Sequence, residues 1–181
     1  MSKMNKNLPK TTRLIRAAVL TGVVFLPVNS MSNIEQRSLS FYHTHTSKTL
    51  KVTYAVGGEY VKPALNEINH FLADFRTGDA TAIDPELLDL IYDVRASLGS
   101  NGTFEVISAY RTPETNKMLR DAGKGVAKKS QHLLGRAIDV RLRNVATSDL
   151  RDAALKIKRG GVGYYKKSDF VHLDTGRVRR W

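Results

Sequence analysis

The chain has 181 residues, of which 29 are Lys or Arg and 17 are Asp or Glu, so its net charge is +12. It contains no cysteine, which excludes disulfide scaffolds, Cys-ligated zinc sites and cysteine nucleophiles. With 41% apolar residues, this length predicts a single domain with a hydrophobic core. The excess of positive charge is typical of proteins that bind nucleic acid or another anionic surface.

The first 30 residues contain five basic residues and no acidic residue. An uncharged apolar run from Ala17 to Leu26 follows the basic residues and ends at Pro27. This run is too short to span a bilayer, which needs about 20 residues. A basic stretch, a short apolar run and small residues near Ser30 are the layout of a secretory signal peptide, which predicts a periplasmic protein without stable membrane insertion after its removal. The alternative is a basic amphipathic or buried helix at the N-terminus.

Residues 31–37 are expected to form a polar linker, and residues 38–181 a single domain. Without its first 30 residues, the chain keeps 24 basic and 17 acidic residues, a net charge of +7. The tightest basic cluster therefore belongs to the expected signal peptide. One Trp and scattered aromatic residues offer no stacking platform for bases, so we expect no nucleic-acid partner. Nothing in the sequence indicates an obligate oligomer, and we expect a monomer.

Both helical and strand periodicities occur along the domain. Alternating apolar residues predict a β-hairpin over residues 38–54, and helical spacing predicts a helix from Glu59 to Phe75. A second helix is expected from Pro85 to Leu98, with Asp84 as its N-cap. Further helices are expected over 112–121 and 148–158, and further strands over 104–107, 137–142, 161–165 and 170–174. Because these elements do not alternate strictly, the predicted fold class is α+β, a small antiparallel sheet flanked by helices.

Two of the predicted strands place polar side chains opposite an apolar face. In the strand over 137–142, Asp139 points away from the alternating apolar residues, and His172 does the same in the strand over 170–174. If these strands are neighbours, their polar faces line one cleft that His132 can reach. Two His and one Asp suit a zinc ion whose fourth coordination position is open. An open position is typical of a catalytic metal.

Three motifs carry a resemblance to a known family. Residues 130–139 read SQHLLGRAID and fit the S-x-H-x-x-G-x-A-x-D signature of the zinc D-alanyl-D-alanine peptidases. Residues 169–172 resemble the acidic-x-x-His element of that family, and residues 108–112 resemble its S-x-Y-R segment. Over residues 38–181 the chain resembles the YcbK/MepK-type murein endopeptidases of this family.

The resemblance implies a hedgehog/DD-peptidase-like fold and a zinc (Zn2+) metallopeptidase that hydrolyses peptide cross-links of peptidoglycan during cell-wall remodelling. It further implies cleavage of cross-links that contain meso-diaminopimelate, although no residue decides between 3-3 and 4-3 cross-links. Carried over residue by residue, it makes His132, Asp139 and His172 the zinc ligands, Asp169 the general base, and Arg111 the cation that faces the scissile carbonyl. Asp174 would orient a ligand, and Ser130 would hydrogen-bond to His132.

Some of these assignments have alternatives. Residues three apart on a straight strand face opposite sides, so Asp169 reaches the metal only if the chain bends before Phe170. Otherwise it is a loop residue paired with a lysine, and Arg111 could likewise pair with Glu114. His43 and His45 are expected at a substrate-facing wall or on a solvated face. The rival function is a non-catalytic, zinc-containing module that binds peptidoglycan through its basic face.

Overall fold

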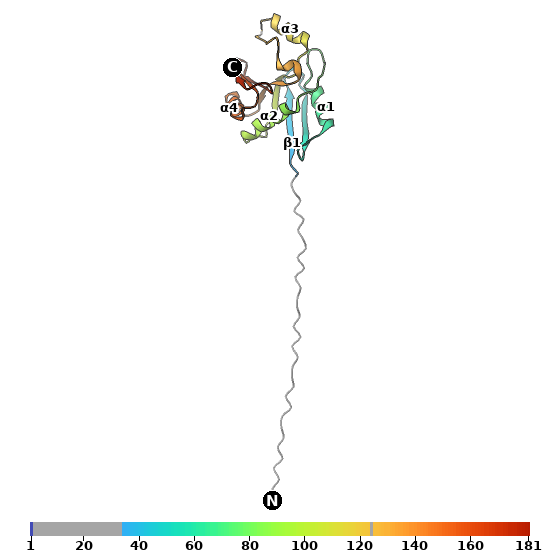
Figure 1. Ribbon diagram of the computed structural model, residues 1–181, viewed down its shortest axis with the longest axis vertical. Helices are drawn as coiled ribbons and strands as arrows, with labels where there is room; N and C mark the ends of the chain where they lie inside the picture. Colours follow the sequence, from blue (N-terminus) through green and yellow to red (C-terminus); the bar gives the residue numbers. More distant parts are fainter. Residues whose placement is uncertain (2–33, 124) are drawn as a thin grey trace. The chain divides into compact units, whose positions relative to one another are not determined.

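The computed structural model describes Met1 and residues 34–123 and 125–181 (Figure 1). The expected signal peptide therefore lies outside the described residues, apart from Met1. Among the described residues, no helix is long and apolar enough to cross a membrane.

An eight-stranded sheet forms the centre of the domain, in the order β3-β2-β1-β4-β5-β7-β6-β8. β1 pairs with β4 and β6 pairs with β8 in parallel, whereas the other neighbours are antiparallel. The α+β prediction is confirmed, although the sheet is larger than expected and mixed. The strands are β1 (Gln36–His43), β2 (Thr49–Val56), β3 (Glu59–Tyr60), β4 (Phe104–Ser108), β5 (Ala137–Leu142), β6 (Gly161–Tyr165), β7 (Phe170–Asp174) and β8 (Arg179–Arg180).

Four α-helices and two short 3-10 helices accompany the sheet. Asp84 caps α2 as predicted, because its carboxylate accepts a hydrogen bond from the Glu86 N–H at 3.1 Å. Thr112 caps α3 in the same way through the Thr115 N–H at 3.2 Å. The helices are α1 (Lys62–Phe71), α2 (Pro85–Ser97), α3 (Pro113–Asp121), α4 (Thr147–Ile157), η1 (Gln131–Leu134) and η2 (Lys166–Ser168).

The core lies between one face of the sheet and helices α1, α2 and α4. Ile138 and Val140 of β5 and Leu173 of β7 are fully buried there, together with Ile68 of α1 and Ile91 of α2. Each such side chain contributes about 1.5–3 kcal/mol relative to an exposed one. Because side chains alternate along a strand, the residues that lie between these core residues on β5 and β7 point to the opposite face of the sheet.

The helix predicted from Glu59 to Phe75 is wrong at both ends. Gly57 and Gly58 have φ angles of 60° and 85°, and this turn brings β3 back alongside β2. The helix then begins next to Pro63, which suits a first helical turn. It ends at Phe71, and the carboxylate of Asp74 accepts a hydrogen bond from the Arg76 N–H at 3.1 Å in the loop that follows.

Two further expectations change at the first hairpin. β1 begins at Gln36, so the linker expected over residues 31–37 ends earlier than predicted. His43 is only 1% exposed and packs against Phe71 and Phe75, with ring centroids 6.1 Å and 5.6 Å away. Burial, together with the positive charge of neighbouring basic groups, lowers the pKa of His43. His43 is therefore a core residue and does not lie on a solvated face.

Candidate metal centre

Asp139 and His172 come from neighbouring antiparallel strands, as the sequence predicts. They are directly paired in the β5–β7 register, and Asp139 Oδ1 lies 2.8 Å from His172 Nδ1. Both side chains are buried, at 4% and 6% exposure, on the face of the sheet opposite the apolar core. The strand register alone therefore brings these two side chains together.

His132 reaches the same point from η1. The Ser130 hydroxyl accepts a hydrogen bond from the His132 N–H at 3.3 Å and begins this turn, as expected. Gly135 ends it at a φ of 66°, where an added Cβ would lie 2.4 Å from the Ala82 carbonyl oxygen. His132 Nε2 then lies 3.2 Å from His172 Nδ1 and 3.3 Å from Asp139 Oδ1.

The outer nitrogen of each imidazole faces an acceptor outside the cluster. His132 Nδ1 lies 2.5 Å from the carbonyl oxygen of Ala109, which can only accept, so the proton is on Nδ1. His172 Nε2 lies 2.8 Å from Asp174 Oδ2, the position expected of a carboxylate that orients this ring. Burial opposes protonation of His172, but the carboxylates of Asp139 and Asp174 raise its pKa. The inner nitrogens, His132 Nε2 and His172 Nδ1, face each other and Asp139.

Three electron-pair donors thus converge, and one ligand atom from each of the three residues lies within 4.8 Å of the others. Two imidazoles and a carboxylate brought this close, with their outer atoms hydrogen-bonded elsewhere, fit a bound cation, which would take the place of a proton on His172 Nδ1. The donor set of two nitrogens and one oxygen is one that zinc accepts.

The charges of the cluster follow from its contacts. Burial opposes ionisation of Asp139, yet the two histidines hold its pKa well below the ordinary value. Burial also opposes ionisation of Asp174, but hydrogen bonds from His172, Arg179 and the Gly176 N–H lower its pKa. Burial lowers the pKa of His132, which favours the neutral imidazole that a metal needs. The site therefore holds two buried carboxylates beside its imidazoles.

Arg111 lies inside this site, as predicted. Its Nη2 donates to Asp139 Oδ2 at 2.6 Å and lies 3.2 Å from His132 Nε2, while its Nε donates to Ser108 Oγ at 2.9 Å. The side chain is 11% exposed and pairs with Asp139 rather than with Glu114. Arg111 is therefore a fixed positive charge at the edge of the three ligand atoms.

Asp169 does not lie in the site, in contrast to the expectation for a general base. Its φ and ψ are 50° and 56°, a left-handed conformation that ends η2 and turns the side chain outward. The carboxylate accepts hydrogen bonds from Thr147 Oγ1 at 2.8 Å and Arg141 Nη1 at 3.4 Å, and the side chain is 59% exposed. The chain does bend before Phe170, but Asp169 is not among the residues that line the cavity over the cluster.

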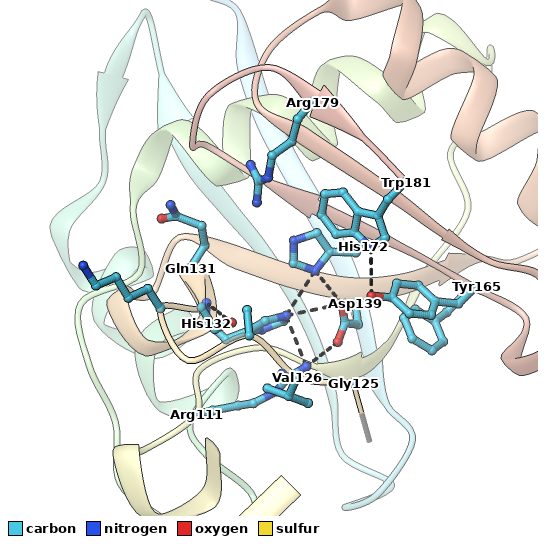
Figure 2. Close-up of a pocket in the computed structure, with 14 residues that line it drawn as sticks. Arg111, Gly125, Val126, Gln131, His132, Asp139, Tyr165, His172, Arg179 and Trp181 are labelled. Atoms are coloured by element: carbon cyan, nitrogen blue, oxygen red, sulfur yellow. Dashed lines mark hydrogen bonds and ion pairs between the residues drawn. The ribbon is translucent and has the colours of Figure 1, made fainter. Parts of the chain in front are cut away.

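A cavity of about 220 Å³ opens over the cluster (Figure 2). Among the described residues that line it, Asp139 is the only one with a carboxylate. The sequence interpretation missed Gln131, Tyr165 and Trp181, which also line the cavity. Trp181 follows β8, a strand of two residues that is too short to show a periodicity. The sequence therefore held no signal that this last residue returns to the site.

The chain is similar to known peptidoglycan endopeptidases. A family model described as peptidoglycan L,D-endopeptidase MepK matches residues 31–181. The chain is 38% identical over 184 aligned positions to peptidoglycan L,D-endopeptidase MepK of Escherichia coli strain K12, and the alignment covers 100% of both chains. It is 34% identical over 167 positions to the probable peptidoglycan L,D-endopeptidase MepK of Haemophilus influenzae, with 90% of each chain covered.

Both comparisons extend across the whole described domain, including the strands that carry Asp139 and His172. The chain therefore belongs to the MepK family of peptidoglycan L,D-endopeptidases, within the M15 metallopeptidases.

Proposed function

We propose that this protein is a zinc-dependent murein endopeptidase that hydrolyses peptide cross-links of peptidoglycan in the periplasm. The observation that carries the proposal is the convergence of His132, Asp139 and His172, with the outer nitrogen of each imidazole hydrogen-bonded elsewhere. The MepK relatives are peptidoglycan endopeptidases by name, which supports the same substrate.

His132 Nε2, His172 Nδ1 and an Asp139 oxygen would hold the ion. A zinc ion with an open position lowers the pKa of water and polarises a peptide carbonyl. The protein contributes rigid orientation, because Ala109 and Asp174 fix the two imidazoles from outside the cluster. Such outer partners typically change metal affinity or activity 10- to 100-fold (about 1.4–2.8 kcal/mol) when they are lost.

Arg111 would stabilise the negative charge that develops on the carbonyl oxygen in the transition state. Its guanidinium is already held by Ser108 and Asp139, so little reorganisation is needed when that charge appears. Burial strengthens the interaction because little water screens it. Removal of one such preorganised donor typically lowers kcat by about 10²–10³.

Exposed basic residues lie along the chain on both sides of the cavity-lining segments. Lys128 and Lys129 precede η1, and Lys166 and Lys167 follow β6. An anionic wall polymer would be attracted to such a surface, and salt would weaken that attraction. The expected signal peptide over residues 1–30 would bring the protein to this polymer, where we propose that it acts as a monomer.

Hydrolysis of purified muropeptide dimers tests the function. The dimers carry either a 3-3 or a 4-3 cross-link, and mass spectrometry follows their conversion to monomers with and without a chelator. We expect conversion that the chelator stops and added zinc restores. Stoichiometric zinc with no conversion of either dimer would instead favour a non-catalytic peptidoglycan-binding module.

A further inference from the structure

Three aromatic side chains meet at one edge of the cavity and are called here the aromatic shelf: Tyr165, Phe170 and Trp181. The rings of Tyr165 and Phe170 are stacked, with centroids 4.5 Å apart and an interplanar angle of 15°. Trp181 Nε1 donates to the Tyr165 hydroxyl at 3.0 Å. The Trp181 ring also lies 5.1 Å from that of His172, so the shelf directly adjoins the metal cluster (Figure 2).

The backbone holds Trp181 in this place. The Trp181 carbonyl accepts from the Tyr164 N–H at 3.0 Å, and the Trp181 N–H donates to the Val162 carbonyl at 3.3 Å. The indole lies over Gly163, where an added Cβ would come within 2.6 Å of Trp181 Cε2. The lack of a side chain at Gly163 therefore leaves room on β6 for the indole of Trp181.

The shelf is not part of the hydrophobic core. Trp181 is 51% exposed and Tyr165 is 38% exposed, and neither belongs to the core cluster. Aromatic side chains that are clustered, hydrogen-bonded to each other and left open beside a cavity are typical of ligand contact. The Trp181 N–H and the Tyr165 hydroxyl hydrogen-bond to each other. The surface that the shelf exposes to a ligand therefore consists mainly of ring faces and edges.

We propose that a stem peptide crosses the metal cluster in an extended form, with an aliphatic side chain of its diamino acid on the aromatic shelf. This proposal rests on the proposed function, because it assigns the substrate contacts of that same site. An unbranched chain of several methylenes matches the shelf, since it can lie flat on the ring surface and carry its polar end into water.

Two synthetic cross-linked peptides test the shelf. One contains diaminopimelate, and the other contains diaminopropionate, which has a single side-chain methylene. The zinc-loaded wild type is expected to prefer the longer side chain about tenfold in kcat/KM, the discrimination that hydrophobic contacts give. Trp181→Ala should remove the preference and Trp181→Phe should retain part of it. An equal loss on both peptides in Trp181→Ala would mean that the indole is only structural and would overturn the shelf.

Val178→Ala is the matched control for Trp181→Ala, because Val178 is 64% exposed near the same end of the chain and does not line the cavity.

A binding experiment distinguishes failure of the aromatic shelf as a peptide subsite from failure of the proposed function. Trp181 is the only tryptophan of the chain, so its fluorescence reports directly on the shelf. Titration of the metal-free wild type with the diaminopimelate peptide should change this fluorescence, and the diaminopropionate peptide should need a concentration about tenfold higher. A wild type that binds both peptides with this difference but hydrolyses neither would contradict the function and keep the subsite. Binding without a length preference would contradict the subsite.

Discussion

Asp139 and His172 face each other across the β5–β7 ladder, with 2.8 Å between the carboxylate Oδ1 and the imidazole Nδ1. Two residues further along β7, Asp174 lies on the same face of the strand and accepts from the outer nitrogen of His172. Because strand side chains alternate, a shift of β7 by one residue would move His172 and Asp174 into the apolar core and away from Asp139. The metal centre and the hydrophobic core therefore specify the same register.

We expect His132→Ala to lose bound zinc, because it removes one of three ligand atoms. The measurement is metal content per chain after dialysis against dilute zinc. His70→Ala is the matched control, since His70 is exposed and hydrogen-bonds only within its own helix. Full zinc occupancy in His132→Ala would show that the ion binds elsewhere.

Arg111→Met should lower kcat by about 10²–10³ while zinc content stays at the wild-type level. The physical reason is the loss of a fixed positive charge that contacts Asp139 without being a ligand itself. Arg143→Met serves as the control, because Arg143 is exposed and pairs with Glu105. A wild-type kcat in Arg111→Met would show that Arg111 does not take part in the reaction.

Asp169→Asn and Asp169→Gly are both expected to keep near wild-type turnover. The carboxylate pairs with Thr147 and Arg141 and does not line the cavity, and Asn and Gly tolerate the left-handed backbone at this position. Asp169→Ala should instead lower the unfolding free energy by about 1–2 kcal/mol through backbone strain. Steady-state hydrolysis and thermal unfolding check the two effects separately. If Asp169→Asn lost turnover but kept its zinc, Asp169 would be the general base after all.

Asp74 should make folding stability depend on pH below about 4. Burial opposes its ionisation, yet hydrogen bonds from Thr115, Thr112 and Arg76 hold its pKa below the ordinary value of about 3.9. Because the folded pKa is the lower one, the ionised carboxylate stabilises the fold fully above pH 4, and this stabilisation is lost as the pH falls through the folded pKa. The unfolding free energy of Asp74→Asn, measured against pH, should therefore fall less steeply than that of the wild type. Equal slopes would contradict this assignment.

Gly163→Ala should displace the indole of Trp181 without changing any aromatic residue. The added Cβ would overlap Trp181 Cε2, so the ring must leave the shelf. The single tryptophan makes this visible as a shift in emission maximum, and the length preference for peptides should fall as in Trp181→Ala. An unchanged spectrum with an unchanged preference would show that the packing against Gly163 does not hold the shelf.

The sequence predicted the centre of the fold well where one periodicity dominated. β5 and β7 have the predicted bounds because each alternates between a core face and a polar face over at least five residues. β6 also has the predicted bounds. The same alternation predicted that Asp139 and His172 share a face, and the caps Asp84 and Thr112 marked two helix starts. These features are local, so short windows of sequence contain them.

The failures come from contacts between distant segments. Tyr60 fits a helical pattern, but pairing with Ala55 across the Gly57–Gly58 turn makes it a strand residue. His43 reads as polar, but Phe71 and Phe75 bury it. The outward turn of Asp169 and the return of Trp181 to the site likewise depend on tertiary contacts that no periodicity encodes.

The most direct test of the central claim is the conversion of 3-3 cross-linked muropeptide dimers to monomers, followed by mass spectrometry for the zinc-loaded wild type and His132→Ala. We predict conversion by the wild type that stops when a chelator removes the metal and resumes when zinc is restored, and no conversion by His132→Ala. Intact dimers in the presence of stoichiometrically bound zinc, or conversion by His132→Ala at the wild-type rate, would contradict the assignment of this cluster as a catalytic metal centre.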